Sequence, residues 1–263
     1  MDFAIPRFPL DHLCDAALDW LTAYGAGATR VLSGFVSAWV SGLTGALQAV
    51  PPWAFILVAA GLAFLWNLGL WAPMLVTLVL VVLSTLAAVL IGLPLGIAAA
   101  LSRRTWRVVS PCMDVMQTMP SFVYLIPAIP FFGLGPVSAC FATIIFAAPP
   151  TIRLTALGIL QVPHEMTEAA DAFGCTPWQK LVKVQLPQAL PTIMAGVNQT
   201  IMLSLSMVVI AAMIGAGGLG REVWSAIQRL EAGRGFQAGI AIAVLAVILD
   251  RVTQAISRRT RTA

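Results

Sequence analysis

Charged side chains are scarce in this chain of 263 residues. Asp, Glu, Lys and Arg make up 10% of it, whereas a soluble domain carries about 25%. Hydrophobic residues make up 59%. This balance excludes an ordinary soluble domain and predicts several membrane spans, each of about 20 residues. The net charge of +4 comes from basic residues that are scattered along the chain, so no nucleic-acid partner is expected.

Residue patterns for catalysis and metal binding are missing as well. The only two lysines, Lys180 and Lys183, do not follow a glycine, so the chain lacks the Gly-Lys pair of a phosphate-binding P-loop. The cysteines stand far apart, without the Cys-x-x-Cys or Cys/His spacing of a metal site. They are Cys14, Cys112, Cys140 and Cys175. The sequence therefore predicts no catalytic residue, no metal site and no cofactor held by this chain.

Long apolar runs predict an all-α, polytopic membrane protein with about six transmembrane helices. The expected spans are residues 52–71, 74–101, 115–132, 136–154, 190–214 and 236–256. The chain is expected to divide into an amphipathic region 1–50, an extra N-terminal span 51–73, a five-helix core 74–257 with a polar loop at 155–188, and a basic tail 258–263. The amphipathic helices of the first region favour a position on the membrane surface, and a span over 28–49 is the alternative.

Proline predicts interruptions in several of these helices, because it has no N–H for the helical hydrogen bond. A bend is expected at Pro94 in the second span. The fourth span is expected to break at Pro149-Pro150. The second helix of the polar loop is expected to stop at Leu186-Pro187.

The third span is too polar to be a simple lipid-facing helix. Its three prolines free backbone carbonyls that lipid cannot satisfy, so this segment must be buried in protein or line a wet cavity. Polar side chains within spans usually face a bundle interior. The third and fifth spans therefore supply the candidates for a solute path. These are Gln117, Thr118, Pro120, Phe122, Tyr124, Asn198, Ser204 and Ser206. Hydrogen bonds between packed helices are the alternative role for the polar members.

The polar loop reads as a helix, a turn and a second helix. Residues 164–173 are good helix formers, and Gly174 can adopt the left-handed conformation that ends a helix. Thr176 is a favoured N-cap, Pro177 suits the first helical position, and Gln179 completes a capping box. A polar segment of this kind between membrane spans is suited to contact a partner.

Basic residues predict the orientation. With 103–110, 151–187 and the C-terminus placed inside, ten Lys and Arg residues lie inside, against three in the loop 215–235. This asymmetry follows the positive-inside rule and puts the polar loop on the cytoplasmic face.

The polar loop also resembles the EAA loop of the membrane subunits of ABC importers, whose pattern is EAA-x3-G-x9-I-x-LP. The matching residues are Glu168, Ala169, Ala170, Gly174, Leu186 and Pro187, with Val184 in place of Ile. The resemblance implies that these six residues couple the chain to a cytoplasmic ATPase.

Further segments narrow the resemblance to the permease subunits of glycine betaine/proline betaine (and choline) ABC importers, the ProW type. They include residues 91–97, 117–127, 183–187, 191–200, 206–214 and 248–251, and the resemblance covers roughly 74–257. It implies a type I importer fold in a bacterial cytoplasmic (inner) membrane. It also implies a permease homodimer, ATPase subunits that hold ATP and Mg²⁺, and an extracytoplasmic substrate-binding protein.

Two other functions remain possible on sequence grounds. One is an ABC importer permease for another small solute, such as an amino-acid derivative. The other is a stand-alone secondary transporter or channel, which would typically carry a transmembrane acidic residue or inverted repeats. The acidic residues that come closest to this are Asp114 and Asp250, near span ends.

Overall fold

The computed structural model describes residues 52–259, with side chains described for 58–254. The predictions for residues 1–50 and for the end of the basic tail therefore lie outside the described residues. Val50–Ala263 form one compact unit, as the contacts within the chain show. The helices and contacts described below all belong to this unit.

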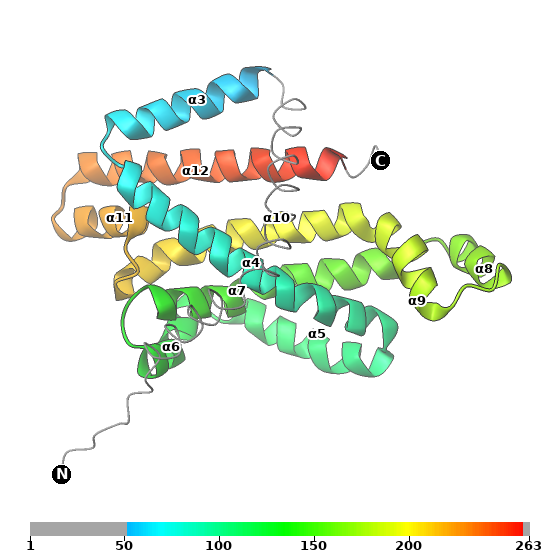
Figure 1. Ribbon diagram of the computed structural model, residues 1–263. Helices are drawn as coiled ribbons and strands as arrows, with labels where there is room; N and C mark the ends of the chain where they lie inside the picture. The colour runs from blue at the N-terminus through cyan, green and yellow to red at the C-terminus, as the bar shows by residue number, and fades with distance from the viewer. Residues whose placement is uncertain (1–51, 260–263) are drawn as a thin grey trace, which may run out of the picture. The chain divides into compact units, whose positions relative to one another are not determined.

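The described residues form helices and turns, with no strand among them. The α-helices are α3 (Pro52–Asn67), α4 (Trp71–Leu101), α5 (Arg103–Thr118), α6 (Leu125–Phe132), α7 (Pro136–Leu160), α8 (His164–Ala172), α9 (Pro177–Lys180), α10 (Leu186–Ala211), α11 (Gly218–Gln228) and α12 (Ala232–Arg259). Two short 3₁₀ helices, η1 (Ser121–Tyr124) and η3 (Ala212–Ile214), and a π-helical segment, η2 (Leu181–Gln185), connect them. The predicted all-α fold is confirmed (Figure 1).

Within residues 52–259, four apolar stretches are long enough to cross a membrane: Trp71–Leu101, Pro136–Leu160, Pro177–Ile214 and Ala232–Gln254. A fifth crossing is possible only if α5 and the segment Ser121–Phe132 count together, and these two are bent by 112°. The expected single span 115–132 is therefore two helices. The 16-residue α3 is shorter than the extra N-terminal span that was expected.

Helices α4, α7 and α10 run side by side and form the centre of the unit (Figure 1). Small residues allow their backbones to approach closely, as is usual between helices in lipid. A Cβ added to Gly96 of α4 would lie 2.7 Å from the carbonyl oxygen of Ile152 in α7. Thr151 of α7 and Thr200 of α10 share a buried hydrogen bond of 2.7 Å.

Two predicted helix breaks are wrong. Helix α7 continues through Pro149 and Pro150 to Leu160, and both prolines are buried. Helix α9 continues into α10 through η2, in which the Leu186 N–H donates to the carbonyl of Leu181, five residues earlier. This wider turn gives room to the ring of Pro187, which in an α-helix would meet the carbonyl four residues before it. Packing on both sides of α7 outweighs the two hydrogen bonds that its prolines lack.

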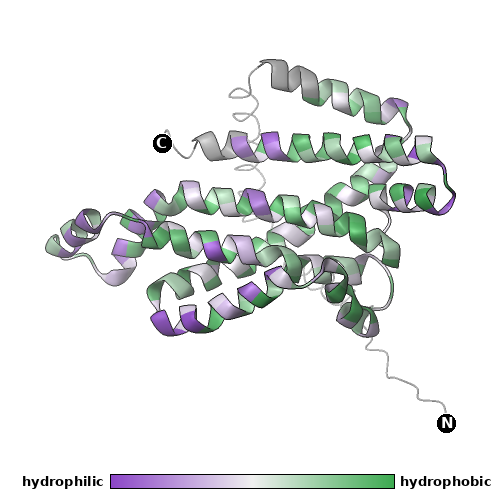
Figure 2. Ribbon diagram, turned by 180° about the vertical axis from the view of Figure 1, so that it is seen from behind, coloured by the Kyte–Doolittle hydropathy of each residue, from purple (hydrophilic) through white to green (hydrophobic). Residues whose placement is uncertain are grey.

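One end of the bundle is polar. Ile159 of α7, Leu181 of η2 and Ala189 of α10 pack with Ala100, near the end of α4, so the start of α5 lies at this end too. Figure 2 shows hydrophilic residues in α8, α9 and the first turns of α5 at this end of the bundle.

The opposite end holds a tight glycine turn. Gly215, Gly217 and Gly218 have positive φ angles, and the Leu219 N–H at the start of α11 donates to Thr77 Oγ1 of α4 at 2.8 Å. The glycines therefore serve a turn and close packing.

Candidate functional site

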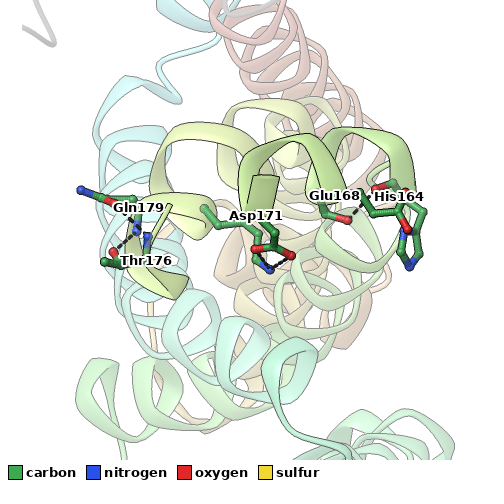
Figure 3. Close-up of polar contacts among 7 residues, drawn as sticks. His164, Glu168, Asp171, Thr176 and Gln179 are labelled. Atoms are coloured by element: carbon green, nitrogen blue, oxygen red, sulfur yellow. Dashed lines mark hydrogen bonds and ion pairs between the residues drawn. The ribbon is translucent and has the colours of Figure 1, made fainter. Parts of the chain in front are cut away.

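Most residues of the α8–α9 loop, residues 164–187, are exposed, and Figure 3 shows the polar contacts within it. Helix α8 ends in a Schellman motif: the N–H of Gly174 donates to the carbonyl of Asp171, and that of Cys175 to the carbonyl of Ala170. Gly174 has φ +72°, as the sequence predicted. The motif satisfies the last carbonyls of α8 and fixes the turn.

Helix α9 begins with the predicted capping box. The Gln179 N–H donates to Thr176 Oγ1 at 3.3 Å, and the Thr176 N–H donates to Gln179 Oε1 at 2.9 Å (Figure 3). Pro177 occupies the first helical position. The two helices of the loop are therefore held by hydrogen bonds between residues near in sequence.

Ion pairs add to these local bonds. Lys180 Nζ of α9 lies 2.7 and 2.8 Å from the two carboxylate oxygens of Asp171 in α8, so it ties the two helices together across Gly174. His164 Nδ1 lies 3.1 Å from Glu168 Oε1, one turn along α8. These contacts orient the loop as one unit.

Large apolar side chains of the loop are exposed. Phe173 is 88% exposed and Trp178 is 71% exposed, and they flank the Gly174 turn in sequence. The loop is also anchored to the bundle, because Leu181 is buried against Ile159 and Ala189. An exposed aromatic pair on a rigid, anchored loop has the character of a protein-binding surface.

The six residues predicted for coupling take different positions in this loop. Glu168 and Ala169 are exposed on α8, whereas Ala170 is buried. Gly174 forms the turn. Leu186 packs against the cluster at the base of the loop, and Pro187 is exposed just beyond η2.

The eight residues predicted for a solute path are not gathered in one place. The exposed members are Gln117 and Thr118 at the end of α5, Pro120 just before η1, Phe122 in η1 and Ser206 in α10. Ser204 is fully buried, with no hydrogen-bond partner for its hydroxyl. Their role in a path stays a prediction.

Tyr124 lies at the bend between α5 and α6 and is only 7% exposed. Its hydroxyl donates to the carbonyl of Met116 in α5, and its ring meets Phe146 of α7 edge-on, with centroids 5.6 Å apart. In this structure, the Tyr124 side chain joins three segments of the chain across the bend.

Asn198 makes a polar contact between helices. Its Nδ2 donates to Asp250 Oδ1 of α12 at 3.2 Å, and Gln254 Nε2 donates to the other oxygen, Oδ2, at 2.7 Å. The carboxylate of Asp250 thus accepts from two neutral amides and ties α12 to α10.

An ion pair that the sequence did not predict joins α5 to α7, between Asp114 Oδ1 and an Nη atom of Arg153. The sequence does indicate a polar face at this point, because Asp114, Gln117 and Thr118 stand at i, i+3 and i+4 of one helix and so lie on the same side of it. Arg153 was placed just beyond the expected break at Pro149-Pro150 and was counted among the basic residues on the inner side, so no partner within the bundle was expected for it.

A family model described as "Binding-protein-dependent transport system inner membrane component" matches residues 92–262. The chain is 48% identical over 278 aligned positions to the glycine betaine/carnitine transport permease protein GbuB of Listeria monocytogenes, covering 98% of both chains. It is 47% identical over 268 positions to the glycine betaine transport system permease protein OpuAB of Bacillus subtilis, covering 95% of both chains.

Similarity to a solved structure agrees with the fold. One chain of the MetNI methionine ABC transporter, solved in an inward-facing conformation, aligns with this protein with a TM-score of 0.66 and 25% identity. The alignment covers 73% of this chain and 95% of that chain. The similarity thus extends over nearly the whole of the solved subunit.

Proposed function

Because this chain belongs to the family of binding-protein-dependent transport system inner membrane components, we propose that it is the permease of an ATP-driven importer for glycine betaine or a related solute, such as proline betaine or choline. The protein is a multi-pass component of the inner membrane. The observation that carries the substrate proposal is the similarity to two glycine betaine permeases along 95–98% of the chain. This chain forms the path of the solute through the membrane, and another subunit hydrolyses ATP.

The partners follow from this role. ATPase subunits that bind ATP and Mg²⁺ dock on the α8–α9 loop from the cytoplasm. The exposed Phe173 and Trp178 supply apolar contact area, and the Schellman motif and capping box keep the loop preorganised. An extracytoplasmic binding protein delivers the solute, and two copies of the permease enclose the path.

Closure of the ATPases moves the α8–α9 loop. The loop is continuous with α10 through η2 and packs against α4 and α7 through Leu181, so its movement reaches the central helices directly. Alternating access of the path to the two sides of the membrane follows from this coupling.

Reconstituted vesicles test the proposal. The permease, an ATPase and a binding protein encoded beside it are reconstituted, and ATP-dependent uptake of labelled glycine betaine, choline and methionine is compared. Uptake of glycine betaine well above that of methionine is expected. Preferential uptake of methionine would favour the second candidate, an importer for an amino-acid derivative, which the fold similarity to a methionine transporter supports.

A labelling experiment in intact cells tests the orientation. After the four native cysteines are replaced by serine, Gln179→Cys in α9 is expected to be unreactive toward an impermeant maleimide added outside. Gln228→Cys, at the end of α11 on the opposite side of the bundle, is expected to react. The reverse pattern would invert the proposed topology.

A further inference from the structure

Helix α5 carries three faces rather than two. Five of its polar residues recur at intervals of three, four and seven, so they form one stripe along an α-helix. The stripe consists of Arg103, Arg107, Asp114, Gln117 and Thr118, and all five are exposed. We call this set the polar stripe.

The other two faces of α5 are apolar. Trp106, Val109 and Met113 pack against Ala148 and Ile152 of α7. A second apolar face, with Val108, Cys112 and Val115, is exposed and suits contact with lipid. The polar stripe is therefore neither packed against the bundle nor part of the apolar exposed face.

Arg153 of α7 meets the polar stripe at Asp114. The side chains of Arg153 and Asp114 are 39% and 60% exposed, so the pair is open on one side. Arg153 stands seven residues before the end of α7, which places its Cα about 10 Å inward from the polar end of that helix at 1.5 Å per residue. Arg153 thus lies within the apolar stretch Pro136–Leu160, and charged groups within a span usually face a bundle interior or a water-filled cavity, because lipid does not solvate them.

We propose that the polar stripe lines the solute path and that the Asp114–Arg153 pair is a transient binding site for the zwitterionic solute. The Asp114 carboxylate receives the quaternary ammonium group, and the Arg153 guanidinium receives the carboxylate. This inference rests on the proposed function for the class of solute, and it assigns a site within the membrane to two residues.

The chemistry of the pair explains why such a site suits a zwitterion. Separating two charges away from bulk water is costly when neither finds a new partner. A betaine carries both opposite charges on one small molecule, so it compensates Asp114 and Arg153 together when it enters between them. A solute with only one charge, such as choline, leaves the other member of the pair uncompensated, so this site favours the betaines among the solutes proposed above. Without solute, Asp114 and Arg153 compensate each other.

Labelling of two positions on α5 tests whether the polar stripe lines water. In the chain with Cys14, Cys112, Cys140 and Cys175 replaced by serine, Gln117→Cys is compared with Val115→Cys, which is on the exposed apolar face. The reagent is a methanethiosulfonate that bears a trimethylammonium group, applied to transporting vesicles. Gln117→Cys is expected to react at least tenfold faster than Val115→Cys, and saturating glycine betaine during turnover should slow its reaction about threefold.

Equal reactivity of the two cysteines would overturn the proposal, because the stripe would then not differ from the lipid-facing side. An unreactive Gln117→Cys would also overturn it, since the stripe would then be covered, for example by a second copy of the chain. Absence of protection by glycine betaine would exclude a solute site there.

A charge-neutral pair tests the role of Asp114 and Arg153. The double variant Asp114→Asn/Arg153→Gln replaces the ion pair by two amides, which can still hydrogen-bond between α5 and α7. Uptake at saturating solute is expected to fall at least tenfold, while the unfolding temperature in detergent stays near that of the wild type. Wild-type uptake by this variant would show that the pair only ties helices and would overturn the proposal. Glycine betaine uptake by the wild type in the same vesicles tests the proposed function separately.

Discussion

The α8–α9 loop and the bend between α5 and α6 both turn the chain sharply, but they do so by different means. In the loop, the turn is fixed by residues within ten positions of one another, through the Schellman motif at Gly174 and the capping box at Thr176. At the bend, Tyr124 donates to Met116 before the break and packs on Phe146, which lies on another helix. A turn of the first kind can be read from a short motif, whereas the second kind depends on the tertiary fold.

The largest effect is expected for Gly174→Val in the loop. A residue other than glycine in the left-handed conformation costs about 1–2 kcal/mol, and a β-branched residue is a poorer fit still. No atom lies within 4 Å of a Cβ added at this position, so the strain is in the backbone alone. Uptake is expected to fall at least tenfold while membrane insertion and the amount of protein stay normal.

Gly69→Val is the matched control for this prediction. Gly69, between α3 and α4, has φ +69° and likewise no atom within 4 Å of an added Cβ. The same strain is therefore placed outside the α8–α9 loop, and uptake should be largely retained. If both variants lose uptake equally, backbone strain anywhere in the chain is the cause, and the loop has no special role.

An intermediate effect is expected at the bend. Tyr124→Phe keeps the ring against Phe146 but removes the hydrogen bond to Met116, and a single such bond contributes about 0.5–1.5 kcal/mol to stability. The unfolding temperature in detergent should therefore fall by a few degrees, with uptake retained. Tyr124→Leu also removes the aromatic contact and should be less stable than Tyr124→Phe.

This pair of variants also separates two roles of Tyr124. If the tyrosine contacts solute through its aromatic face, Tyr124→Phe transports normally and Tyr124→Leu loses uptake without a matching loss of stability. If it only stabilises the bend, Tyr124→Phe loses some stability with uptake retained, and any loss of uptake in Tyr124→Leu is matched by a larger loss of stability.

How much could be predicted from the sequence follows from the same comparison. The helix ends at Gly174 and Thr176 were predicted correctly because their hydrogen bonds join residues close in sequence. The break at Pro149-Pro150 was predicted wrongly, since packing of α7 between α4 and α10 keeps the helix intact. That error had a consequence, because it placed Arg153 beyond a break in the helix and hid its contact with Asp114.

The bend at Met119-Pro120 was missed for a related reason. Three prolines indicated that the third span was irregular, but no local pattern gives the angle of 112° or the contact of Tyr124 with Phe146 of α7. The wide turn at η2 was likewise not predicted from the sequence. Pro187 was expected to end a helix, and the chain instead accommodates it by one π-helical turn that the packing of Leu181 holds in place.

The smallest effect is expected for Lys180→Met, which tests how far the α8–α9 loop depends on its ion pair. The variant removes the two contacts to Asp171 but keeps an apolar stem of similar length. Ion pairs near the surface contribute about 0.2–1 kcal/mol, and the Schellman motif and capping box remain. Uptake should therefore fall less than threefold, and the difference from the wild type should shrink as salt rises and screens the pair.

Lys183→Met, two residues into η2, controls for the loss of one positive charge at the cytoplasmic face. A tenfold loss for Lys180→Met alone would mean that the angle between α8 and α9 is set by the ion pair, and that the local motifs are not sufficient to hold it.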